Sequence, residues 1–371
     1  MSGPGAPVTD QGEAFARIRL LRSPNVGPVT YAQLLRRFGS AEAAIEALPD
    51  LARRGSTAYR AAAPRRIEDE IAAVRKMQAR YLFHDSPDYP PLLREVDGSP
   101  PILTVRGEAA IALRPCVAMV GARNASAAAV KLARDFAAAL AEAGFVVVSG
   151  LARGIDGAAH RGALSGAAPA TIGVIASGID IAYPPEHGEL QEQVAQQGLL
   201  VAEQPPGTEP LARHFPSRNR IIAGMALGTL VVEAAPRSGS LITARLAGEA
   251  GREVMAIPGS PLDPRSHGCN QLIRDGAVLV QSADDVIELL GHFAGTPQSY
   301  LRESGETFEL SHEPDDTEPA DIAMLLGSAP VAVDELIRQS GQTASAVQLA
   351  LLELELAGQL VRHAGGRVSR S

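Results

Sequence analysis

The chain has 371 residues, more than one hydrophobic core usually spans, so we expect two or three domains. Its hydrophobic fraction of 46% and charged fraction of 20% exclude a disordered chain. The formal net charge of −8 argues only weakly against a nucleic-acid partner, because such binding depends on local clusters of cations. Two distant cysteines, no signal-peptide pattern and no apolar run of membrane-spanning length predict a cytoplasmic protein without membrane contact.

The N-terminal residues are expected to form a small helical domain behind a short tail. Residues 1–11 read as a disordered tail, and residues 12–81 as helices joined by tight turns. The Pro-x-x-Gly-Pro turn from Pro24 to Pro28 is similar to turns in helix-hairpin-helix and sterile-alpha-motif-like domains. A hairpin of this kind can hold DNA phosphates with backbone N–H groups. A domain for packing or protein contact is the alternative, which we favour.

Residues 82–291 show the pattern of an α/β core. A Pro-rich segment, with a short strand over Ile102–Arg106, leads into short apolar runs that alternate with helical patterns. Continuously apolar runs rich in Val and Ile are typical of buried parallel strands, so we predict a doubly wound, mostly parallel sheet. The predicted strands are Cys116–Val120, Phe145–Ser149, Thr171–Ala176, Leu199–Ala202, Thr229–Ala234, Val254–Ile257 and Ala277–Val280. The predicted helices are Ser126–Ala143, Asp156–Leu164, Glu186–Gln197, Arg218–Leu227, Leu241–Ala250 and Asp284–Leu290.

Small-residue loops follow three of these strands. A parallel sheet with crossover helices brings such loops to one edge, outside the carboxyl ends of the strands. Backbone N–H groups at the helix N-termini there favour anions. We therefore expect one phosphate-binding crevice, built from the residues Gly121, Ala122, Arg123, Ser149, Gly150, Ser238, Gly239 and Ser240.

The motifs of nucleotide-dependent enzymes are missing. There is no G-x-x-x-x-G-K-[ST] loop and no G-x-G-x-x-G after the first strand, so we expect no nucleotide cofactor. Asp156 and His160 lie four residues apart on one helix and could share a metal, but a structural role is the favoured interpretation because no third ligand is evident. Glu203 and Glu233 could be catalytic carboxylates, but for each we favour a strand-end residue that holds a neighbouring loop amide.

The most informative polar cluster lies in the segment GTEPLARHFPSRNRIIAG. Basic residues interleaved with an aromatic residue are the usual device for binding single-stranded nucleic acid, because cations hold phosphates and rings stack on bases. The alternative, a phenylalanine packed under the loop with solvated arginines, is equally weighted on this cluster alone. The candidate residues are Arg213, Phe215, Arg218, Asn219 and Arg220.

The C-terminal part is predicted to be a separate domain. Residues 292–317 are polar and acidic and read as a flexible linker. Residues 318–371 resemble a winged helix, with helices over Val333–Gln339 and Thr343–Ala357 and two short strands near the C-terminus. The basic residues lie on the wing rather than on the last helix. Protein contact or dimer support is therefore placed slightly ahead of sequence-specific DNA reading.

Seven motifs occur in an order that resembles one family. They are VGARNAS, SGLARGIDGAAHRGAL, GIDIAYPPEH, HFPSRNRIIAG, VVEAAPRSGSLITA, GREVMAIPG and GCNQLIRDGA. Together they are similar to the DNA processing protein A family (DprA, or Smf), over about residues 82–290. The resemblance implies an extended Rossmann-like core that binds single-stranded DNA, forms a homodimer, and contacts RecA and loads it during natural transformation. It also implies no cofactor, no metal and no catalysed reaction.

The resemblance also assigns roles to particular residues. Gly121, Ala122 and Arg123 stand at the family's Gly-Ser-Arg phosphate site, where Ala122 removes one hydroxyl donor. Phe215 stands at the aromatic residue that abuts DNA, residues 218–220 at the Arg-Asn-Arg run, and Arg213 is the candidate for a lysine that some members carry. The competing class is a LOG-type phosphoribohydrolase, which needs a Gly-Gly-x-Gly-Thr-x-x-Glu loop. This chain reads PRSGSLITA there and has no following acid.

Overall fold

A computed structural model describes residues 10–51, 59–166, 170–291, 322–327, 331–344, 346–347, 350–351, 354, 360–363 and 367–370. The chain divides into two compact units, Met1–Ser299 and Tyr300–Ser371. Residues 1–9 of the predicted tail and the whole predicted acidic linker, 292–317, lie outside the described residues.

The first unit begins with four helices: α1 (Gln11–Leu21), α2 (Pro28–Phe38), α3 (Ala41–Leu51) and α4 (Pro64–Lys76). Asp10 caps α1 by accepting the backbone N–H of Glu13 at 2.7 Å, and α2 and α4 begin with proline, which suits the first helical turn. The first three helices share a small apolar core that contains Leu20, Tyr31 and Leu34, whereas Ile67 of α4 packs in a second cluster with Ile18 of α1. The helical domain predicted for this region is therefore present.

The sheet of the first unit has the order β1-β2-β6-β5-β4-β3-β7-β8-β9 among the described residues. Neighbours from β6 across to β9 pair in parallel, whereas β1, β2 and β6 pair antiparallel. The mostly parallel sheet predicted from the apolar runs is confirmed. The strands are β1 (Arg80–Phe83), β2 (Ile102–Gly107), β3 (Cys116–Val120), β4 (Val146–Ser149), β5 (Thr171–Ile175), β6 (Leu199–Ala202), β7 (Gly228–Val231), β8 (Glu253–Ala256) and β9 (Val278–Leu279).

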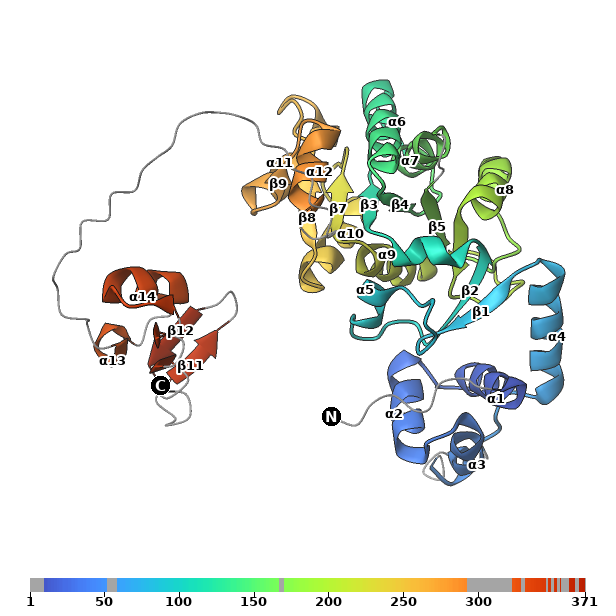
Figure 1. The fold of residues 1–371 in the computed structure, drawn as a ribbon. Coiled ribbons are helices and arrows are strands. Elements are labelled where there is room, and N and C mark those ends of the chain that lie inside the picture. The colour runs from blue at the N-terminus through green and yellow to red at the C-terminus, as the bar shows by residue number, and fades with distance from the viewer. Residues whose placement is uncertain are drawn as a thin grey trace. The chain divides into compact units, whose positions relative to one another are not determined.

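Helices cover both faces of this sheet (Figure 1). One face carries α6 (Ala127–Glu142), α7 (Ile155–Leu164) and α8 (Gly188–Gln197), and the other carries α9 (His214–Met225) and α10 (Gly239–Glu249). Three further helices complete the unit: α5 (Pro91–Arg94), α11 (His267–Arg274) and α12 (Ala283–Gly291). Chain order reverses between the neighbours β3 and β7, and ligands of doubly wound folds bind beside such a switch point.

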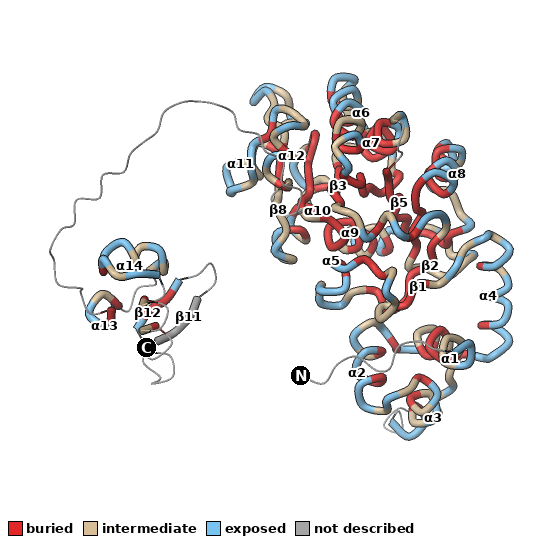
Figure 2. Tube along the Cα trace, viewed as in Figure 1, coloured by how far each residue is buried: buried red, intermediate tan, exposed pale blue. Residues whose placement is uncertain are grey.

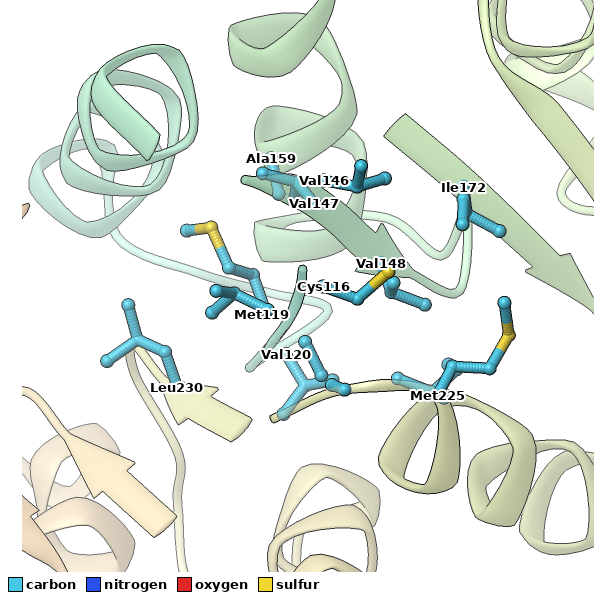
Figure 3. Packing of buried hydrophobic residues seen from close by; sticks show 14 of the residues in the cluster. Cys116, Met119, Val120, Val146, Val147, Val148, Ala159, Ile172, Met225 and Leu230 are labelled. Carbon is cyan, nitrogen blue, oxygen red and sulfur yellow. The ribbon is translucent and has the colours of Figure 1, made fainter. Parts of the chain in front are cut away.

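The central strands are buried on both faces, as the red segments of Figure 2 show. Figure 3 shows side chains of β3 and β4, including Met119 and Val147, packed between Ala159 of α7 and Met225 of α9. Burial on both faces explains why these strands are apolar at every position rather than at alternate ones. Cys116 begins β3 within this core, and burial raises the pKa of its thiol to about 12.

Two predicted boundaries in the first unit are wrong. The helices predicted over residues 12–81 end at Lys76, because Arg80–Phe83 forms β1 and its pairing with β2 overrides the local helical pattern. The helix predicted to begin at Arg218 begins at His214, four residues earlier. Pro216 lies in its first turn, where a missing backbone N–H costs nothing. Phe215 is therefore the second residue of a helix, not part of a loop.

The second unit contains α13 (Ile322–Leu325), β10 (Val331–Ala332), α14 (Val333–Ser340), β11 (Leu360–His363) and β12 (Arg367–Arg370). Its sheet has the order β10-β12-β11, and Leu336, Val347 and Val368 belong to its apolar core. This arrangement fits the predicted winged helix. The helix predicted over Thr343–Ala357 falls largely outside the described residues. Among the described helices of both units, none is long and apolar enough to cross a membrane.

Candidate nucleic-acid interface

A small cavity of about 40 Å³ opens at the carboxyl ends of β3, β4 and β5, against the first turns of α9. Three guanidinium groups and two aromatic rings contribute to its walls. Its lining residues are Arg123, Gly150, Ala152, Arg153, Tyr183, Pro184, Phe215 and Arg218. Four of the predicted site residues, Arg123, Gly150, Phe215 and Arg218, thus meet around one cavity.

The loop after β3 is fixed by Glu233, which follows β7. The backbone N–H of Ala122 donates to the Glu233 carbonyl oxygen at 2.7 Å, and the N–H of Ser126 donates to Glu233 Oε1 at 3.0 Å. Ser126 in turn caps α6 by accepting the N–H of Ala129 at 3.1 Å. The interpretation of Glu233 as a strand-end residue that holds a loop amide is confirmed. Its carboxylate is engaged in positioning this loop.

The loop after β4 is held by buried side chains of α7 and by a third residue beyond β5. The backbone N–H of Gly150 donates to Asp156 Oδ2 at 3.1 Å, and that of Leu151 donates to His160 Nε2 at 3.4 Å. His187 Nδ1 donates to the Leu151 carbonyl at 2.9 Å. Leu151 has a φ of 55°, a left-handed conformation that a branched side chain rarely adopts without such support.

His160 is a neutral structural residue in this arrangement. Thr171 Oγ1 donates to the Val147 carbonyl at 2.8 Å, so it accepts the N–H of His160 Nδ1, also at 2.8 Å. Burial, with the nearby cationic groups of His187 and Arg218, lowers the pKa of His160 to about 3. Asp156 and His160 therefore each hold backbone of the same loop, and the structural interpretation of this pair is the one that fits.

Arg218 reaches from α9 to the cavity floor under this loop. A Cβ atom on Gly150 would lie 1.5 Å from Arg218 Nη1, so a side chain at this position would displace the guanidinium. Burial lowers the pKa of Arg218 to about 10, while the charge of Asp156 opposes this shift. The group stays cationic at neutral pH. Its Nε has no hydrogen-bond partner within the described part of the chain.

Arg123 is exposed at the rim of the cavity, and its guanidinium carbon lies 5.1 Å from the centroid of the Phe215 ring. Phe215 is half-buried, and its other neighbour is the ring of Tyr183, with centroids 5.6 Å apart. No ion pair joins Arg123 to an acid among the described residues, whereas Arg153 pairs with Glu186. Arg123 is thus the cation of this cavity that is most open to an external anion.

Several predicted site residues make contacts elsewhere. The hydroxyl of Ser149 is fully buried and donates to the Met119 carbonyl at 2.6 Å. Arg220 forms an ion pair with Glu203, which is the role the structure gives to that carboxylate. Asn219 Nδ2 donates to the Gly239 carbonyl at 3.4 Å. These contacts leave Ser149 and Arg220 without a place in the cavity wall.

The loop after β7 also stays outside the cavity. The hydroxyls of Ser238 and Ser240 contact each other, and Gly239 begins α10. Two predicted site residues from other loops also lie outside the cavity: Arg213 is exposed at the N-terminal end of α9, and Gly121, after β3, packs close to Ile155. Neither they nor Ser238, Gly239 and Ser240 line the cavity.

Sequence reasoning missed four lining residues: Ala152, Arg153, Tyr183 and Pro184. These residues were predictable, because the loops after β4 and β5 leave the same edge of the parallel sheet as the loop after β3.

The backbone amides of Ala122, Gly150 and Leu151 all have acceptors within the protein. An anion in the cavity would therefore bind to the guanidinium groups, because these backbone N–H groups already donate to acceptors within the protein.

A larger cavity of about 520 Å³ lies between α2 and the Pro-rich segment around Ser99. Its polar lining includes the acids Asp85 and Asp97 beside Arg17 and Arg36. It contains none of the predicted site residues, and its mixed charge does not suit a polyanion. The smaller, cation-lined cavity is the better candidate in spite of its size.

The family profile of the DNA recombination-mediator protein A matches residues 80–291, more than half of the chain. The chain belongs to this family. Two further profiles match on either side of residues 80–291. They are a DprA-like N-terminal helix-hairpin-helix domain at residues 11–73 and a DprA winged helix domain at residues 306–366. The helix-hairpin-helix and winged-helix resemblances noted in the sequence are thereby confirmed.

Individual relatives extend the match. Protein Smf of Escherichia coli is 38% identical over 308 residues, which cover 81% of this chain and 80% of the relative. DNA processing protein DprA of Streptococcus pneumoniae is 46% identical over 199 residues, covering 54% of this chain and 70% of the relative. The recombination-mediator core is the segment in which the motifs of the cavity lie.

Solved structures show the same architecture. The X-ray structure of DprA from Streptococcus pneumoniae aligns with a TM-score of 0.64 at 36% identity, covering 74% of this chain and 97% of that one. DNA processing protein A from Helicobacter pylori, described for its single-stranded DNA binding mode, aligns with a TM-score of 0.53 at 28% identity. It covers 58% of this chain and 97% of that one.

Proposed function

We propose that this recombination mediator binds single-stranded DNA at the cavity between the β3, β4 and β5 loops and α9, and that it does so without catalysis. The observation that carries the proposal is the meeting of Arg123 and Arg218 with the Phe215 and Tyr183 rings around one cavity. Cations next to aromatic rings suit a strand whose phosphates and bases are both accessible. The DNA-binding relative from Helicobacter pylori supports the same assignment.

Double-stranded DNA lacks the unpaired bases that the aromatic rings of this site would contact. Its bases are paired and stacked inside the helix, so the rings have no free base faces to contact. Fluorescence anisotropy with a labelled oligonucleotide, alone and annealed to its complement, tests the proposal across a series of salt concentrations. We expect many-fold tighter binding of the single strand and a fall in affinity as salt rises. Equal affinity for both forms would contradict the proposal.

We further propose that the protein works as a homodimer that delivers bound strands to RecA in the cytoplasm. Membership of the recombination-mediator family supports the delivery role. The edge strand β9 supports the dimer, because Val278 and Leu279 are 36% and 45% exposed and Leu262, in the loop after β8, is 92% exposed. Sedimentation equilibrium should give twice the chain mass. RecA should assemble faster on oligonucleotides that carry this protein than on bare ones.

The competing function is hydrolysis of nucleoside monophosphates. Such an enzyme needs an acid or base placed against the ribose. Glu233 follows β7 at the start of the loop after that strand, and it is 7% exposed and bonded to the amide of Ser126. Incubation with AMP should therefore release no adenine on chromatography. Turnover that disappears in Glu233→Gln would favour the hydrolase instead.

A further inference from the structure

Tyr183 is the aromatic side chain with the most open position at the cavity. It follows β5, its side chain is 43% exposed, and it lines the cavity beside Pro184. The planes of the Tyr183 and Phe215 rings are tilted by 60°, with centroids 5.6 Å apart. This is a direct ring contact, so no base fits between the two rings. A base that stacks here must use an outer ring face.

Phe215 is less available than Tyr183. The Arg123 guanidinium carbon lies 5.1 Å from its ring centroid, and the centroid of the Tyr183 ring lies 5.6 Å from it. The residue is only half-exposed. Phe215 therefore holds its two neighbours, a cation and a second ring, while Tyr183 keeps the freer surface.

The walls of the cavity suit a phosphate better than a base. Three guanidinium groups line it, and guanidinium groups pair with phosphate oxygens. A nucleotide whose phosphate contacts Arg123 and Arg218 would have its base at the rim of the cavity. Tyr183 lies on that rim, next to the cations.

We propose that Tyr183 provides the stacking surface for an unpaired base, and that Phe215 positions both Tyr183 and Arg123. This inference rests on the proposed binding of single-stranded DNA. It assigns the base-dependent part of the affinity to Tyr183 and makes Phe215 mainly a positioning residue.

The test compares an oligothymidylate with an abasic oligomer of the same length and the same phosphates. Wild-type protein should bind the oligothymidylate more tightly. Tyr183→Leu should lose this preference, with a fall of about 5- to 150-fold for oligothymidylate, the range for loss of one stacked base, and little change for the abasic strand. Tyr183→Phe should behave as the wild type. Phe215→Leu should weaken binding to both strands, because Arg123 loses its support.

Leu113→Ala is the matched control, because Leu113 is 46% exposed, close to the value for Tyr183, and lies outside the cavity. Unchanged binding in Tyr183→Leu, or an equal loss on both strands, would overturn the inference while leaving DNA binding itself in place. A wild-type protein that binds neither strand would instead overturn the proposed function. Thermal denaturation of each variant establishes that it is folded.

Discussion

Two loops at the same edge of the sheet, after β4 and after β7, have similar sequences and different roles. Residues 149–150 read Ser-Gly before α7, and residues 238–239 also read Ser-Gly, with Gly239 as the first residue of α10. The loop after β4 is packed against Arg218 and forms the cavity floor, whereas a Cβ atom on Gly239 would meet nothing within 4 Å, and this glycine stays outside the cavity. A Gly/Ser loop after a parallel strand thus identifies the functional edge, but the buried side chains beneath it decide which loop forms the site.

The largest effect should come from Gly150, with Gly239 in the other loop as its matched control. Gly150→Ala places a Cβ 1.5 Å from Arg218 Nη1 and must displace that buried guanidinium, whose charge is offset by Asp156. Forcing extra volume into a packed site costs about 1–3 kcal/mol, so urea denaturation should show a loss of that order. Gly239→Ala, at the start of α10, should change the free energy of unfolding by less than about 1 kcal/mol. Equal losses would remove the distinction between the loops.

The loop after β4 should also make stability depend on pH. The folded-state pKa of His160 is about 3 against 6.5 in the unfolded chain, so the unfolded state binds the extra proton as pH falls below 6.5. Stability is therefore complete above that pH and is lost by about 2 kcal/mol on reaching about pH 5. His160→Gln should flatten this part of the profile, measured by urea denaturation at each pH. A variant with the wild-type slope would show that His160 does not titrate in this way.

The smallest effect should come from the hydroxyls of the loop after β7. Ser238 and Ser240 contact each other and lie outside the cavity. The double variant Ser238→Ala, Ser240→Ala should change the affinity for single-stranded DNA by less than about twofold, because neither hydroxyl lines the cavity. An anisotropy titration measures this. A large loss would extend the interface to β7.

The sequence predicts much of the fold because the core strands are apolar throughout. The bounds predicted for β3 and β6 match the structure, and those of the other core strands differ by a few residues. The strand β1 was missed because Arg80–Phe83 follows directly on a helical pattern and becomes a strand only by pairing with β2. Local patterns carry no information on such distant pairing partners.

The candidate site is less predictable for the same reason. Arg220 reads as a phosphate ligand until Glu203 is found beside it, and Ser149 reads as an exposed loop hydroxyl until its bond to Met119 is seen. These partners lie 17 and 30 residues away in the chain. Residue type indicates which chemistry is available, and only packing decides which groups remain open to a ligand. Arg123 stays a candidate because no acid neutralises it among the described residues.

The most direct test of this account is the salt dependence of single-stranded DNA binding in Arg123→Ala. Arg245→Ala is the matched control, since this arginine is 69% exposed on α10 and lies outside the cavity. If the Arg123 guanidinium holds a phosphate, its loss should weaken binding and reduce the slope of log affinity against log salt by about 0.7, the value for one phosphate of a single strand. The control should keep both the affinity and the slope of the wild type. An unchanged slope in a folded Arg123→Ala protein would contradict the central claim that the cations of this cavity bind the DNA backbone.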